Sequence, residues 1–397
     1  IPHKHSSFKS NDSVLTTQDT AEGTLVYLEN LKPLAFTVIQ TSNENNTLVE
    51  PFTFDGRILQ TPFYTIEFDD KGHIKHLYDK EAEREVLAPN QCGNVIQTFE
   101  DRPMSYDAWD IDIYYQEKPA IVDNLVKFTV KEKGPLRFVL EIEWQHLHSK
   151  IYQDIIFYAH TRRIDFKTKV DWRERRRLMK VAFPVDIRTT KATYDIQFGN
   201  IERPNHWNTS WDLAKFEVVG HKWADLSDGG YGISLLNDCK YGYDIKGNVM
   251  RLTLLKSPTY PDPEADLGVH EFTYALYPHL DDWRKAQTEI EAFKLNNPLN
   301  VFEGCFDELS QSLIIIDKDN VEISAIKKAE YDDAYIIRLY EFEGKKTKCT
   351  LTSDYTIITI TETDLMENEI GPTENTQVLT ITLNPYEIRT FKIRFKK

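Results

Sequence analysis

Cysteine is scarce in this chain, and its few copies form no motif. The 397 residues include four cysteines, Cys92, Cys239, Cys305 and Cys349, and no two of them make a CxxC pair. This spacing excludes zinc fingers and dithiol redox sites, which need closely spaced pairs. We therefore expect free thiols, which are typical of a reducing compartment, and we predict a cytoplasmic protein.

Long apolar runs and an excess of positive charge are also lacking. No stretch of the sequence reaches the roughly 18–20 apolar residues that a membrane span requires. Lys and Arg number 48 and Asp and Glu number 63, which gives a formal net charge of −15. Because proteins that bind phosphate backbones or anionic lipids present basic surfaces, we expect neither a nucleic acid nor a membrane as a partner.

Familiar catalytic signatures are missing as well. The sequence has no GxGxxG, Walker A, HExxH or GxSxG motif, which excludes the common nucleotide-binding, metalloprotease and serine-hydrolase patterns. The chain begins at Ile1 without an initiator Met or the apolar region of a signal peptide. We therefore expect a fragment of a longer protein.

Strand signals dominate what is present. Alternating or β-branched runs predict a hairpin over residues 63–78, with its turn at 69–72, and a four-stranded meander over 127–172. Five further runs between 314 and 383 have the same character. Short strands at regular spacing are typical of sandwiches and not of βαβ units.

One helical segment interrupts the strands. Asp281 and Asp282 can cap it, apolar residues recur at helical spacing over 283–293, and Pro298 follows its end. We interpret this helix as a connector between domains. The predicted fold is therefore all-β, with a leading β segment or linker over 1–50, a large twisted β-sandwich over 51–299, and a small C-terminal β-sandwich over 300–397.

The richest polar stretch covers residues 100–112 and contains four Asp and one Glu. Glycoside hydrolysis commonly uses two carboxylates, and on a strand Asp110 and Asp112 would share one face with Trp109 on the other. The alternative is an acidic loop that accepts backbone N–H bonds and an ion pair from Arg102, and the spacing alone favours it.

Other polar clusters are less specific. Residues 198–212 combine Trp, Asn, His and Arg, which suits either a sugar site or a loop held by buried polar contacts. His270 could act as a general acid, and His279 with Asp281, or His146 with His148, could begin a metal site. Two ligands do not complete a zinc site, so we predict no metal ligands in this chain.

Several of these blocks resemble the C-terminal half of the family 38 α-mannosidases, in the bacterial and eukaryotic-cytosolic branch. The resemblance is close over about residues 55–300 and extends to the tail. Its motifs are FEDRP at 99–103, DAWDID at 107–112, FGNIERP at 198–204, NTSWD at 208–212, HKWADLS at 221–227, LLKSP at 254–258, YPH at 277–279, RLYE at 338–341 and NPYEIRT at 384–390.

The resemblance implies a retaining, zinc-dependent α-mannosidase that acts on mannose-containing oligosaccharides. It also implies that the large sandwich is a supersandwich of the galactose-mutarotase-like type. The family's zinc ligands and aspartate nucleophile belong to an N-terminal catalytic domain that precedes this region. We therefore expect no catalytic residue, zinc ligand or other cofactor in this chain, and an accessory role beside that domain. A homo-oligomer stays open.

The resemblance further implies that sandwich loops help to close the sugar pocket. Trp109 is the candidate platform for a mannose ring at the pocket rim, with Asp107 and Asp110 binding sugar hydroxyls or bracing Trp109. The alternative is a self-sufficient carbohydrate-binding or mutarotase-like sandwich. A mutarotase needs a His acid and a carboxylate base in one cleft, and the candidates are His206, His270, Glu202 and Glu271.

Overall fold

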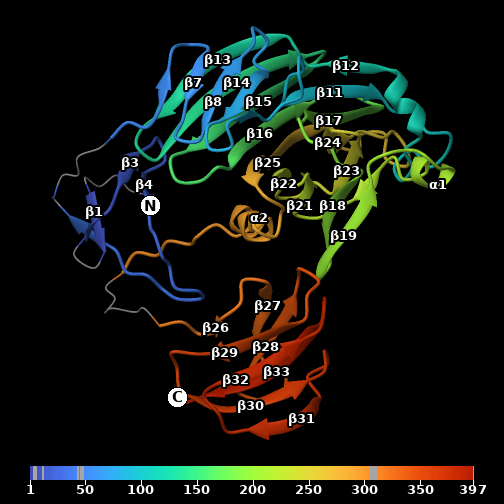
Figure 1. Cartoon of the computed structure of the whole chain (residues 1–397). Helices are drawn as coiled ribbons and strands as arrows, with labels where there is room; N and C mark the ends of the chain where they lie inside the picture. Colours follow the sequence, from blue (N-terminus) through green and yellow to red (C-terminus); the bar gives the residue numbers. More distant parts are fainter. Residues whose placement is uncertain (3–6, 11–12, 43, 45–48, 305–310, 397) are drawn as a thin grey trace.

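The computed structural model describes residues 1–2, 7–10, 13–42, 44, 49–304 and 311–396. Within this part of the chain, long antiparallel sheets build two sandwiches of different size (Figure 1). The all-β prediction is confirmed. The cysteine at position 305 lies outside the described residues, and the other three are free thiols.

A nine-stranded sheet forms one layer of the large sandwich. The predicted meander is its first part, because β13 to β16 pair consecutively and antiparallel. Later strands extend the sheet, and β25 joins the meander to the rest. In spatial order the strands are β13 (Leu125–Lys133), β14 (Arg137–His146), β15 (Ser149–Tyr158), β16 (Ile164–Trp172), β25 (Gly268–Leu280), β22 (Tyr231–Asn237), β21 (Trp223–Ser227), β18 (Lys191–Ile196) and β19 (Gly199–Pro204).

Two smaller sheets form the opposing layer. The predicted hairpin lies in the five-stranded sheet, which consists of β10 (Arg84–Glu85), β9 (Ile74–Asp79), β8 (Tyr64–Phe68), β7 (Ile58–Gln60) and β6 (Thr53–Phe54). The six-stranded sheet consists of β12 (Pro119–Ile121), β11 (Val95–Glu100), β17 (Arg177–Pro184), β24 (Val249–Lys256), β23 (Gly242–Lys246) and β20 (Val218–Val219).

Alternation along the strands builds the core between these layers. On β14 the side chains of Phe138, Leu140, Ile142 and Trp144 are at most 1% exposed, because every second residue of a strand points to the same face. On β17, Met179, Val181 and Phe183 enter the same core, so the residues between them face away from it. That outward face carries the candidate site described below.

A short leading segment lies at the other end of the large sandwich. Its strands are β1 (Ser7–Ser10), β2 (Ser13–Val14), β3 (Thr17–Asp19), β4 (Thr24–Val26) and β5 (Gln40–Ser42). The buried carboxamide of Gln18 accepts hydrogen bonds from the backbone N–H groups of Leu136 at 2.9 Å and Arg137 at 2.8 Å. These bonds attach the segment to the start of β14.

The small sandwich packs a three-stranded sheet on a five-stranded one. Its core is made by buried residues such as Ile337, Leu351, Ile360 and Leu383. The strands are β26 (Ile315–Ile316), β29 (Thr347–Thr352) and β32 (Leu379–Leu383) in one sheet, and β27 (Val321–Lys328), β28 (Tyr335–Glu341), β33 (Ile388–Phe395), β30 (Ile357–Thr363) and β31 (Glu369–Glu374) in the other.

The connector helix lies between the sandwiches but begins later than predicted (Figure 1). Helix α2 spans Thr288–Asn296, whereas the Asp282 carboxylate accepts the N–H groups of Arg284 and Lys285 and closes a separate turn. Trp283 lies in that turn, and its side chain is 3% exposed. It is buried in a cluster shared by both sandwiches, which we call the junction core, where it packs on Trp223 with ring centroids 4.9 Å apart. No helix in the described part of the chain is long and apolar enough to cross a membrane.

Charged side chains also meet at this junction, and we call them the junction network: Asp195, Lys222, Glu289, Glu322 and Tyr340. Lys222 forms ion pairs with Glu289 and, at 4.0 Å, with Glu322. The Tyr340 hydroxyl donates to Glu322 at 2.9 Å. Because Glu322 and Tyr340 belong to β27 and β28, this network joins the small sandwich to the large one.

Candidate functional site

The DAWDID block forms a loop, not a strand. After β11 the chain turns at residues 107–109, where the N–H groups of Trp109 and Asp110 both reach the Tyr106 carbonyl. The 3-10 helix η1 (Ile113–Glu117) follows and leads into β12. The predicted strand face shared by Asp110 and Asp112 is therefore wrong, because turn hydrogen bonds replace the two-residue alternation of a strand.

Trp109 projects from this loop into solvent. Its side chain is 68% exposed, and its one described ring contact is an edge-to-face approach to Tyr106 at 6.5 Å between centroids. An indole with an open face can stack on the apolar face of a sugar ring. The position of Trp109 is thus compatible with the predicted rim platform, which remains a prediction.

Asp107 links the loop to the segment that follows β24. Its carboxylate accepts hydrogen bonds from the Thr259 N–H at 2.6 Å and the Thr259 hydroxyl at 3.0 Å. Partial burial acts to raise the pKa of Asp107, but these bonds outweigh it and leave that pKa below its ordinary value. Asp110 is exposed, and its carboxylate makes no hydrogen bond or ion pair with the other described residues. Asp107 therefore holds the turn to Thr259, and the predicted roles of Asp107 and Asp110 toward a sugar or Trp109 remain predictions.

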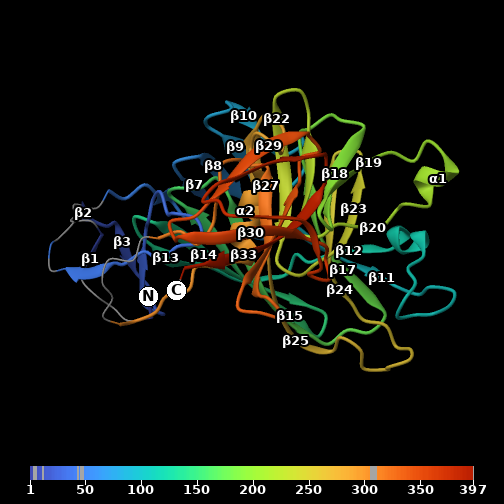
Figure 2. The same ribbon diagram turned by 90° about the horizontal axis from the view of Figure 1, so that it is seen from below.

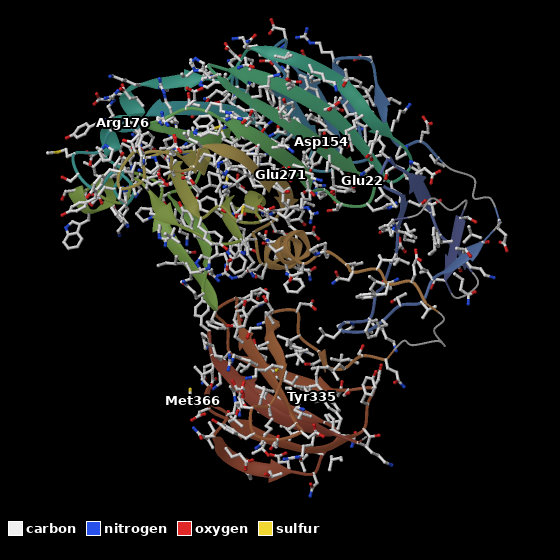
Figure 3. All side chains as sticks on the ribbon, turned by 180° about the vertical axis from the view of Figure 1, so that it is seen from behind. Glu22, Asp154, Arg176, Glu271, Tyr335 and Met366 are labelled. Carbon is white, nitrogen blue, oxygen red and sulfur yellow. The ribbon has the colours of Figure 1, made fainter. Side chains whose placement is uncertain are left out.

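Asp101 anchors the beginning of the same loop. It is 1% exposed and lies 3.0 Å from the Lys256 ammonium, and its N–H donates to the Arg176 carbonyl. Burial raises the pKa of Asp101 above its ordinary value although Lys256 opposes this shift. Arg176 in turn donates to the Thr259 hydroxyl at 3.1 Å, and Figure 3 shows it at the end of the molecule that carries these loops.

A small pocket of about 180 Å³ opens beside η1. Arg102 lies 2.5 Å from Glu100, and Lys118 lies 2.7 Å from the same carboxylate. These ion pairs fit the interpretation of residues 100–112 as an acidic structural loop. The lining residues are Glu100, Asp101, Arg102, Pro103, Asp112, Tyr114, Tyr115, Glu117 and Lys118.

Beneath η1 lies a buried polar cluster that the sequence analysis missed, and we call it the loop network: Tyr115, Lys180, Glu217 and Asp244. Lys180, on β17, has a side chain that is 0% exposed and pairs with Glu217 and, at 3.6 Å, with Asp244. The Tyr115 hydroxyl lies 3.0 Å from each of these carboxylates. The available signal was a single lysine inside the otherwise apolar run LMKVAFP of β17.

The second polar stretch, 198–212, divides into two parts. Strand β19 forms the edge of the nine-stranded sheet, and Asn200 there donates to the Phe342 carbonyl of the small sandwich at 2.7 Å. Helix α1 (Ser210–Leu213), closed by a Thr209 capping box, carries Trp211, which is 79% exposed. Asn200 therefore has a structural role, whereas helix α1, which carries Trp211, lies at the same end of the molecule as β12, the strand that follows η1 (Figures 1 and 2).

Among the described residues, no hydrogen bond or ion pair joins a candidate histidine to a candidate carboxylate. His270 bonds to the Asp266 carbonyl at 2.8 Å, and His206 lies 3.7 Å from Asp212. Glu202 pairs with Lys191 on the neighbouring strand. Glu202 lies on β19, which is four strands away from the β25 strand of His270 in the sheet. Glu271 follows His270 directly on β25, and successive residues of a strand point to opposite faces. The acid–base pair that a mutarotase needs is not assembled by these residues.

Metal-binding clusters are absent from the described residues. No group of three or more His, Cys, Asp and Glu side chains there could hold a metal ion. His279 is buried against Asp225 at 2.9 Å, and the Asp281 carboxylate pairs instead with Lys285. His146 lies 2.9 Å from the Thr98 hydroxyl. These residues therefore do not fit zinc, the metal that the resemblance implies.

Comparisons with known proteins point to one family. The chain matches the description "Glycosyl hydrolases family 38 C-terminal domain" over residues 59–264 and "Glycosyl hydrolases family 38 C-terminal beta sandwich domain" over 320–391. Alpha-mannosidase G of Dictyostelium discoideum is 38% identical over 392 residues, which cover 91% of this chain and 36% of the relative. The alpha-mannosidase of Saccharomyces cerevisiae is 34% identical over 365 residues, with coverages of 82% and 33%.

The chain thus spans about a third of the length of the curated relatives it matches. A solved structure of a protein in the glycosyl hydrolase family 38 from Enterococcus faecalis has the same fold. Its TM-score is 0.75 at 14% identity, and the match covers 97% of this chain and 51% of that chain.

Proposed function

This chain belongs to glycosyl hydrolase family 38, as a C-terminal part, and we propose that it is the β-sandwich portion of an α-mannosidase that hydrolyses terminal α-linked mannose with retention. The observation that carries the proposal is the match along nearly the whole chain to relatives named as alpha-mannosidases. A mannose-containing oligosaccharide is then the substrate of the complete enzyme.

Within that enzyme we assign this chain an accessory role, namely pocket closure and support of a preceding catalytic domain. The exposed Trp109 on a loop anchored through Asp101 and Asp107 supports pocket closure, because a scaffold presents binding groups on fixed loops. Zinc and the nucleophile belong, in this proposal, to the preceding domain. The free thiols of the described residues support placing the enzyme in the cytoplasm.

Turnover of an aryl α-mannoside by the full-length protein and by this chain alone tests the proposal. A retaining mechanism needs two carboxyl groups about 5 Å apart at the scissile bond. We expect zinc-dependent turnover by the full-length protein, with the product sugar first appearing as the α-anomer by NMR. We expect none by the chain alone, with or without zinc. An inactive full-length protein would overturn the assignment, and turnover by the chain alone would overturn its accessory role.

A further inference from the structure

The loop network connects four segments that are far apart in the sequence. Tyr115 comes from η1, Lys180 from β17, Glu217 from the segment between α1 and β20, and Asp244 from β23. Tyr115 is 4% exposed, and Asp244 is 2% exposed. Strands β17 and β23 belong to the same six-stranded sheet, whereas the other two segments lie outside it, so the network attaches both segments to one sheet.

Apolar packing supports the same connection. The Phe99 and Tyr115 rings meet edge to face at 5.1 Å and form a small core with Leu178. Ile111 from the first loop and Phe216 from the second pack against this core. Each loop thus contributes one apolar and one polar contact to the same patch, and each loop also carries an exposed tryptophan.

The charges of the network depend on one another. Lys180 lies over the Tyr115 ring at 5.0 Å and pairs with two carboxylates. The single hydroxyl proton of Tyr115 can be donated to only one carboxylate at a time, although both lie at 3.0 Å. Without the Tyr115 hydroxyl, Glu217 keeps only its pair with Lys180 among the described residues, and η1 loses its polar bond to the second loop.

We propose that Tyr115 and Lys180 are positioning residues that hold the Trp109 loop (residues 101–118) and the Trp211 loop (residues 205–217) in one arrangement, and that this arrangement sets the affinity for the mannoside. The inference rests on the proposed function, because it places Trp109 at the sugar pocket. It goes further in assigning the placement of both loops to one buried cluster.

The test uses Tyr115→Phe, with Tyr114→Phe as the matched control. Both tyrosines lie in η1, but Tyr114 is 67% exposed and outside the network. Hydrogen exchange of the full-length protein reports the loops directly. For Tyr115→Phe we expect faster exchange in both loops, by about fivefold, the effect of one hydrogen bond. Tyr114→Phe should leave both loops unchanged. A change in the first loop alone, or in neither, would overturn the coupling.

Kinetics separate this inference from the proposed function. In the full-length enzyme we expect Tyr115→Phe to raise KM about fivefold with kcat nearly constant, since positioning of a rim affects binding before chemistry. Lys180→Arg should raise KM less than Lys180→Met does. If Trp109→Ala raises KM and Tyr115→Phe does not, the positioning role is wrong. If Trp109→Ala leaves the kinetics unchanged, the pocket assignment itself fails.

Discussion

Two lysines in this molecule, Lys180 and Lys222, lie among carboxylates, and their environments shift the lysine pKa in opposite directions. Lys180 is 0% exposed, and burial lowers its pKa to about 8 although Asp244 opposes this shift. Lys222 is 25% exposed, and its carboxylate neighbours outweigh burial and raise its pKa above the ordinary value. Two lysines with carboxylate neighbours therefore have pKa shifts of opposite sign, because desolvation and charge pairing compete and their balance depends on the access of water.

The two networks also connect different parts of the molecule. The loop network fixes irregular loops to a sheet, whereas the junction network joins two folded sandwiches. In the junction network, burial and then the nearby Glu289 raise the pKa of Asp195 to about 7. Burial likewise raises the pKa of Glu322. The junction therefore contains more carboxylate than its single lysine can neutralise, and its stability should depend on pH.

The largest expected effect is that of removing the more deeply buried lysine. Lys180→Met leaves Glu217 without its buried cation, whereas Asp244 keeps its pair with Arg251 at 3.1 Å, and we expect a loss of about 3–5 kcal/mol in the free energy of unfolding. Lys222→Met should cost less, roughly 1–3 kcal/mol, because water reaches its site. Urea denaturation of both variants measures the difference. Lys118→Met, at an exposed ion pair, is the control and should change stability by less than about 0.5 kcal/mol. Equal losses at positions 180 and 222 would contradict the comparison.

A smaller effect is expected from Asp195 and from pH. A carboxyl whose pKa is raised on folding stabilises the protein fully below its unfolded pKa of about 4, and this contribution is lost as pH rises to about 7. Asp195→Asn keeps an acceptor for the Lys222 N–H, which lies 2.8 Å away, and removes the charge. We expect its free energy of unfolding to exceed that of the wild type by about 1–2 kcal/mol at pH 8 and by less at pH 5.

Urea denaturation at the two pH values measures this difference, and the exposed Asp70→Asn serves as control. A stability difference between wild type and Asp195→Asn that is the same at both pH values would show that Asp195 is already ionised in the folded protein at pH 5.

The smallest effect on stability is expected at the exposed tryptophan. Trp109→Ala should change the free energy of unfolding by less than about 0.5 kcal/mol, since little of the ring is buried. In the full-length enzyme it should lower kcat/KM by about fivefold through the lost stacking face. Trp223→Ala is the matched contrast: its ring is 1% exposed in the junction core, and we expect a loss of about 3–5 kcal/mol. A collapsed melting curve for Trp109→Ala would contradict the rim assignment.

Much of this fold was predictable from local pattern. The hairpin at 63–78 and the meander at 127–172 formed where period-two alternation and turn residues predicted them, because one buried face strongly constrains each strand. The helix start was predicted too early, since the Asp282 cap closes a turn that Trp283 anchors in the junction. Local pattern could not distinguish a helix cap from this turn, because both use the same carboxylate–amide bonds.

For the candidate site, the sequence by itself determined the residue types and the family, through motifs such as DAWDID and FGNIERP. Only the tertiary structure decided their surroundings. It exposed Trp109, bonded Asp107 to Thr259, and brought Tyr115, Lys180 and Glu217 together from distant segments. The physical reason is that burial and charge pairing are properties of a place in the fold. A lysine in a strand has the same local sequence signal whether its ammonium meets water or two carboxylates.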